Sequence, residues 1–190
     1  MNISSHFIGV CIDDKYVSAM ITELGAYIRE HSLVDAIVVQ DIRSLHITLY
    51  YLDASLKSGD LEDIKADCYN LTAHGYGIAE APFVVKYFGE AGGERVCYLR
   101  PNNVDMLTKC NEILASKYRF DKIAENMLAF VPHITLFRIV DPKRFASHKI
   151  KLEMIIDQYL GYLSASNCAG KIQLYAVDSS VSPELQIPID

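Results

Sequence analysis

Hydrophobic residues recur along this chain with two different spacings, and each spacing predicts a type of secondary structure. Apolar residues three and four positions apart line one face of an α-helix, and they recur in this way in segments 17–28, 61–71, 104–114 and 152–163. Short runs rich in β-branched and aromatic residues favour strands, and such runs are 7–12, 36–40, 45–52, 83–88, 95–99, 130–140 and 171–177. The tail from Ser179 is expected to be irregular or a paired edge. This order of strands and helices predicts an α+β fold.

Two of the predicted strands contain the same tetrapeptide. The copies are His46-Ile47-Thr48-Leu49 and His133-Ile134-Thr135-Leu136, 87 residues apart. Alternate residues of a strand face the same side, so the histidine and threonine of each copy are expected to project from one face. Together with the order of elements around them, the copies predict a duplication. We expect two α+β lobes, each with one motif strand, related by an approximate twofold axis.

Two histidines and two hydroxyls on one face suit phosphodiester chemistry. A neutral imidazole can accept a proton from the attacking water or hydroxyl, and an imidazolium can donate one to the leaving oxygen. The hydroxyls of Thr48 and Thr135 can donate hydrogen bonds to non-bridging phosphate oxygens. The acidic residues that follow the motifs are Asp53 and Asp141, both several residues beyond the His-Thr pairs, so we expect a mechanism without metal. A single His-x-Thr in a strand usually has no function, and it is the second copy that favours a functional interpretation.

Composition limits the remaining possibilities. The 190 residues predict one large domain or two small lobes, and a content of 51% hydrophobic and 22% charged residues is typical of an ordinary soluble globular protein. The formal net charge of −6 argues against a protein that grips long nucleic acid, so any nucleotide or RNA contact is expected to be local. No apolar run approaches the roughly 20 residues that span a bilayer, and the N-terminal residues do not resemble a secretory signal. Five scattered cysteines without a CxxC pair predict reduced thiols and a cytoplasmic location.

These motifs resemble those of the 2H phosphoesterase superfamily, and most closely its branch of RNA 2',3'-cyclic phosphodiesterases, also called 2'-5' RNA ligase-like proteins. That superfamily is defined by two His-x-Thr/Ser-hydrophobic motifs, one in each lobe of a bilobal α+β fold. The resemblance covers roughly residues 6–178, and Arg95-Val96 occupies the place of a family strand that starts with an Arg-Val pair. It implies one domain over residues 1–190, with two antiparallel-sheet lobes, pseudo-twofold symmetry and helices on the outer faces.

The resemblance also implies roles for the motif residues. His46 and His133 would share a central cleft as general base and general acid, in an order that the sequence leaves open. Thr48 and Thr135 would bind the phosphate. The implied reaction opens a 2',3'-cyclic phosphate or cleaves a 2'-5' linkage on a nucleotide or RNA end, without metal or cofactor. The nucleotide or RNA end is the expected partner, and we expect a monomer with no membrane contact.

Three further residues are candidates for substrate binding. Arg138, five residues after the second histidine, falls where many ligase-like members carry an arginine and can pair with phosphate. Strict alternation puts Arg138 on the face opposite His133, so either the strand bends or bulges, or Arg138 is a structural or rim residue. Tyr50 and Phe137, four residues after their histidines, fall on the site face by the same alternation and can stack on a base. The alternative is that both are core aromatics.

Other functions stay open at this point. Another diester is possible as substrate, such as a 2'-5' oligoadenylate, a cyclic dinucleotide or an RNA 3' end. A nucleotide- or RNA-binding module with little turnover would keep the site but does not need both imidazoles. A structural protein with chance motifs would bind neither phosphate nor nucleotide at the histidines.

Overall fold

The computed structural model describes residues 3–52, 56, 58–118, 130–163, 168–178, 180 and 185–189. Every helix and strand that the hydrophobic pattern predicts is present among them. The helices are α1 (Lys15–Glu30), α2 (Ser58–Ala73), α3 (Asp105–Lys117) and α4 (Pro142–Leu163), with a short 3-10 helix at Ile42–Ser44. The strands are β1 (Ile3–Cys11), β2 (Ile37–Val39), β3 (His46–Tyr51), β4 (Ile78–Phe88), β5 (Val96–Asn103), β6 (Ile134–Ile139), β7 (Cys168–Ala169), β8 (Ile172–Asp178) and β9 (Leu185–Ile189).

The two motif strands lie in the middle of one antiparallel sheet. Its strands follow the order β7-β4-β5-β6-β3-β1-β8-β9, and β2 pairs with β6 on the side. The motif strands β3 and β6 meet through the pair Ile47 and Ile134, which is the same position in both tetrapeptides. One lobe is therefore β4, β5 and β6 with β2, and the other is β3, β1, β8 and β9. The approximate twofold axis runs between the two motif strands.

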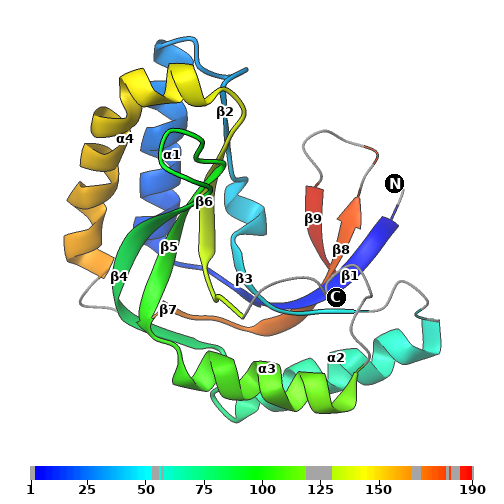
Figure 1. Ribbon diagram of the computed structural model, residues 1–190. Helices are drawn as coiled ribbons and strands as arrows, with labels where there is room; N and C mark the ends of the chain where they lie inside the picture. The colour runs from blue at the N-terminus through cyan, green and yellow to red at the C-terminus, as the bar shows by residue number, and fades with distance from the viewer. Residues whose placement is uncertain are drawn as a thin grey trace.

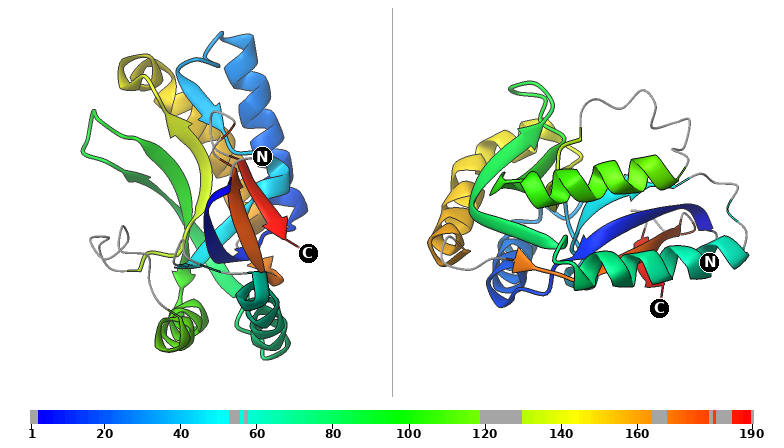
Figure 2. Two further views of the ribbon diagram at one scale, coloured as in Figure 1. Left: turned by 90° about the vertical axis from the view of Figure 1, so that its right-hand side faces the viewer. Right: turned by 90° about the horizontal axis from the view of Figure 1, so that it is seen from below.

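The lobes are interleaved along the chain. Helices α1 and α4 pack against each other and cover the lobe that contains β4 and β6, whereas α2 and α3 lie beneath the lobe of β1, β3 and β8 (Figures 1 and 2). Strand β8, close to the C-terminus, completes the lobe that β1 begins. The predicted antiparallel lobes with outer helices are thus confirmed, although neither lobe is a continuous half of the sequence.

Local sequence signals explain where the helices begin. The Asp14 carboxylate accepts hydrogen bonds from the backbone N–H groups of Tyr16 and Val17, which caps α1. Asp141 does the same for Lys143 and Arg144 ahead of α4, whose first residue is Pro142. None of the described helices is long and apolar enough to cross a lipid bilayer.

Candidate active site

The pair of motif isoleucines brings both His-Thr pairs together. Ile47 and Ile134 are fully buried and lie directly opposite each other. In an antiparallel pair their neighbours project to the other face, which places His46 across from Thr135 and Thr48 across from His133. Opposite residues have Cβ atoms about 5 Å apart. The four side chains named from the sequence therefore share one small area at the centre of the sheet.

The face that carries these four side chains is the side of the sheet that the described helices leave uncovered, and we call it the open face. The view of Figure 2 (left) looks toward it, with α1 and α4 behind the sheet and α2 and α3 below. On β1 and β8, Ile8 and Leu174 point to the helices and belong to the main core. Phe7, Tyr175 and Val177 form a separate buried cluster on the open face.

Both motif strands contain a β-bulge at the same position. The register between β1 and β3 shifts between Ile8 and Gly9, which leaves Leu49 without a partner residue. The register between β5 and β6 shifts between Cys97 and Tyr98, which leaves Leu136 without one. Each leucine is the third residue after its histidine. A bulge inserts one extra residue, so the alternation of faces is reversed beyond it.

The bulges correct two expectations. Tyr50 is 2% exposed and its hydroxyl donates to the Tyr118 carbonyl at 2.8 Å. Phe137 is 0% exposed and its ring centroid lies 6.0 Å from that of Phe145. The placement of these two residues on the site face by strict alternation is wrong, because the bulge turns the fourth residue after each histidine into the core. Both are core aromatics.

The same bulges bring the fifth residue after each histidine onto the open face. On the neighbouring strand β5, Val96 lies opposite Arg138 and Tyr98 lies opposite Thr135. Val96 and Tyr98 are two residues apart. Alternate residues of a strand face the same side, so the partners of these two β5 residues do too. Arg138, which is exposed, therefore projects from the same face as Thr135. On β3 the equivalent residue is Tyr51, opposite Phe7 and 37% exposed. Sequence reasoning missed Tyr51, and the available signal was the doubled bulky pair after each threonine, Leu-Tyr and Leu-Phe, which breaks a strict alternation.

Each histidine is anchored in the same way. His46 Nδ1 hydrogen-bonds the Ser44 carbonyl at 2.7 Å, and His133 Nδ1 hydrogen-bonds the Val131 carbonyl at 2.8 Å. A carbonyl oxygen only accepts, so in both rings Nδ1 is the donor and carries the proton. In the neutral ring Nε2 then holds the lone pair. Two imidazoles thus offer the same nitrogen for proton transfer.

Each histidine is also flanked by a stacked aromatic pair. Phe7 and Tyr175 are parallel, with centroids 4.8 Å apart, and lie 4.8 Å and 5.1 Å from the His46 ring. Phe88 and Tyr98 have centroids 4.2 Å apart, and each lies 5.0 Å from the His133 ring. These rings fix the orientation of the imidazoles and keep water from one side of them.

This enclosure changes the acidity of both histidines. Burial lowers the pKa of His46 to about 4, against the opposing effect of the Ser44 hydrogen bond, and the positive charges of His133 and Arg138 lower it further. Burial also lowers the pKa of His133, with a smaller contribution from the charge of Arg138. The charge of His133 acts on His46, and the charge of Arg138 acts on both histidines, so the three side chains lie within electrostatic range.

No group of three or more His, Cys, Asp or Glu side chains in the described part of the chain is arranged to hold a metal ion. Asp53 lies outside the described residues. Asp141, which follows the second motif, caps α4 through its carboxylate. The described surroundings of the histidines are therefore aromatic and cationic, not carboxylate-rich.

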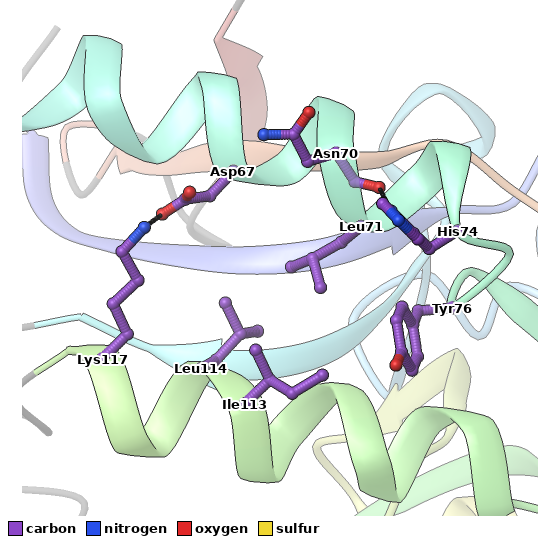
Figure 3. A pocket seen from close by; sticks show the side chains of 8 residues that line it. All are labelled: Asp67, Asn70, Leu71, His74, Tyr76, Ile113, Leu114 and Lys117. Atoms are coloured by element: carbon purple, nitrogen blue, oxygen red, sulfur yellow. Dashed lines mark hydrogen bonds and ion pairs between the residues drawn. The ribbon is translucent and has the colours of Figure 1, made fainter.

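A groove between α2 and α3 lies away from the motifs. It has a volume of about 310 Å³, with Leu71, Ile113 and Leu114 between its polar residues (Figure 3). Those polar residues are engaged locally: Asp67 pairs with Lys117, and His74 Nδ1 hydrogen-bonds the Asn70 carbonyl of its own helix. None of the motif residues lines this groove, so we place the candidate site on the open face.

Comparisons with known proteins agree with this architecture. No protein-family model matches the sequence, and no curated protein matches it. Among solved structures, TT0787 of Thermus thermophilus aligns with a TM-score of 0.57 and 14% identity, covering 98% of this chain and 95% of that one. The two proteins share one fold. Escherichia coli LigT in complex with 3'-AMP aligns with a TM-score of 0.49 and 16% identity, covering 98% and 95% of the two chains. A structure described as a phosphoesterase aligns with a TM-score of 0.47 and 15% identity, with the same coverage.

The predicted fold class is confirmed by the strand order and by the likeness to TT0787 over nearly the whole length.

Proposed function

We propose that this protein is a metal-independent phosphodiesterase that hydrolyses 2',3'-cyclic phosphate or 2'-5' phosphodiester bonds of nucleotides or RNA ends. One observation carries the proposal. Two histidines, each with Nδ1 engaged by a backbone carbonyl, lie beside two threonines on the same face of the sheet. That arrangement supplies two proton-transfer groups and two phosphate-binding hydroxyls without a metal.

In the proposed reaction the phosphate lies between the two His-Thr pairs. One imidazole takes a proton from the attacking water at Nε2, and the other donates a proton from Nε2 to the leaving oxygen. The hydroxyls of Thr48 and Thr135 hold the non-bridging oxygens, whose charge is kept through the transition state. In the free protein burial favours neutral rings, so the negative phosphate is what stabilises the one imidazolium that the reaction needs.

Arg138 and Tyr51 complete the proposed substrate site. Arg138 is positively charged and lies on the open face near both histidines, which suits it to pair with a phosphate oxygen. Tyr51 presents a partly exposed ring at the equivalent place of the other lobe, which suits it to stack on a base. Tyr50 and Phe137 take no part in this proposal because they are buried.

The test is an assay in the presence of EDTA with nucleoside 2',3'-cyclic monophosphates and a 2'-5' linked dinucleotide. We expect turnover of at least one of them, lost in His46→Ala and in His133→Ala. His74→Ala, at the end of α2, is the matched control and is expected to keep full activity.

The outcomes separate the alternatives. Near-full activity in either motif variant would contradict the two-histidine mechanism. Cleavage of the dinucleotide alone would keep the mechanism and assign a role on oligoadenylates. Nucleotide binding that depends on His46 and His133 without turnover would identify a binding module. A cytoplasmic location and a monomeric state stay predictions.

A further inference from the structure

The open face continues beyond the His-Thr pairs onto β5 and β4. Tyr98 lies opposite Thr135, and Lys86 lies opposite Tyr98 on the next strand, so the three residues form a line across three strands. Neighbouring strands are about 4.8 Å apart, which puts Lys86 roughly 10 Å from Thr135. Arg100 lies two residues after Tyr98 and so faces the same side.

The cations of this region are not neutralised within the described structure. Lys86, Arg100 and Arg138 are exposed and form no ion pair with any described residue. Five basic side chains elsewhere do form ion pairs with carboxylates: Arg43, Lys65, Lys117, Arg144 and Lys149. In a protein of net charge −6, this face is therefore a local concentration of positive charge.

No acidic residue stands on the open face where β4 residues 84–88 pair with β5 residues 96–100. Those positions are Val84, Lys86, Phe88, Val96, Tyr98 and Arg100. The aromatic members, Phe88 and Tyr98, are stacked on each other next to His133. The charge of Arg100 acts on the Tyr98 hydroxyl, where it lowers the pKa against the larger raising effect of burial, so the guanidinium lies near that ring. Cations beside aromatic rings are the pattern that binds single-stranded nucleic acid.

We propose that Lys86 and Arg100 form a second phosphate-binding subsite, which holds the phosphate of the nucleotide adjacent to the reacting one. The inference rests on the proposed function and extends it. It makes a short oligonucleotide with a reactive end, and not an isolated mononucleotide, the preferred substrate. The contact is with the backbone, so the preference is independent of the flanking base.

The experiment compares three substrates with the same reactive end: a nucleoside 2',3'-cyclic phosphate, the same nucleotide with a 5'-phosphate, and a trinucleotide that ends in the cyclic phosphate. For the wild type we expect kcat/KM to rise about tenfold from the first to the last at low salt. In the double variant Lys86→Gln, Arg100→Gln this ratio falls to about one. The slope of log KM for the trinucleotide against log salt decreases by about 1.4, the value for two lost contacts to a single strand.

The matched control removes two exposed lysines of α4, on the other side of the sheet, as Lys143→Gln, Lys151→Gln. This control keeps the net charge of the test variant, and we expect it to retain the wild-type preference. An unchanged preference in the Lys86, Arg100 variant, or an equal loss in the control, would overturn the subsite.

Failure of the proposed function can be distinguished from failure of the subsite. If none of the three substrates is hydrolysed, fluorescence anisotropy with a labelled trinucleotide 3'-phosphate measures the subsite directly. A Kd about tenfold weaker in the Lys86, Arg100 variant than in the α4 control would support it. Equal Kd values in the two variants would overturn it.

Discussion

The motif strands β3 and β6 have the same backbone arrangement but differ in one of the side chains that face the candidate site. Both have the histidine anchored to the carbonyl two residues earlier, a stacked aromatic pair beside the ring, and a bulge at the following leucine. They differ at the fifth position after the histidine, which is Tyr51 in one lobe and Arg138 in the other. The repeated part is the geometry for proton transfer, and the part that differs is the contact with substrate.

The largest effect on kcat is expected from the two motif histidines, which we predict to have different roles in proton transfer. His46 has its pKa lowered to about 4 by burial and by two positive neighbours, so we predict that it is the general base and His133 the general acid. Loss of either is expected to reduce kcat on a natural diester by about 10²–10⁴-fold. A p-nitrophenyl phosphodiester has a leaving group that needs no proton. On that substrate His133→Ala should keep most of the wild-type kcat, whereas His46→Ala should not. Equal losses would show that the roles are not divided in this way.

The next largest effect is on stability, and it tests whether the motif strands have a bulge or follow strict alternation. Phe137→Ala removes a fully buried ring and is expected to lower the free energy of unfolding by about 3–5 kcal/mol. Tyr50→Phe removes one hydrogen bond to the Tyr118 carbonyl and should cost about 1 kcal/mol. Urea denaturation measures both. If Phe137→Ala left stability unchanged but weakened nucleotide binding, the ring would lie on the open face and β6 would have no bulge at Leu136.

A smaller effect distinguishes the two substrate-facing residues. Arg138→Gln removes a charge-assisted contact to phosphate, so KM should rise about tenfold for every base. Tyr51→Leu removes a stacking surface, and its KM effect should be larger for purine than for pyrimidine substrates. Steady-state kinetics with adenosine and cytidine 2',3'-cyclic phosphates tests both. An equal effect of Tyr51→Leu on the two nucleotides would argue that its ring does not contact the base.

Much of this architecture is predictable from the sequence because it depends on hydrophobic spacing. The stripe from Val17 to Ile28 forms the buried side of α1, and Asp141-Pro142 begins α4. The Ile47 and Ile134 positions face the core as alternation requires. Alternation failed beyond Leu49 and Leu136 because each strand has a bulge there against its neighbour. The doubled bulky pairs Leu-Tyr and Leu-Phe mark these positions in the sequence, but the neighbouring strand against which each bulge forms is known only from the fold. The interleaving of the lobes was not predictable from the sequence either, because β1 pairs with β8, which comes from the other end of the chain.

The smallest expected effect concerns the charge state of the more enclosed histidine. The pKa of His46 in the folded protein is about 4, below the 6.5 of an exposed histidine. The unfolded chain therefore binds a proton between these pH values that the folded chain does not, so the stability contributed by His46 is lost as pH falls from about 6.5 toward 4. The denaturation midpoint of the wild type should decrease more steeply over this range than that of His46→Gln, which lacks the titrating group. NMR titration of the imidazole gives the direct value, and a phosphate ligand should raise it because a nearby anion favours the imidazolium. An apparent pKa near 6.5 in the free protein would mean that the aromatic pair of Phe7 and Tyr175 does not exclude water from the ring, and the predicted difference between the two histidines would then have no basis.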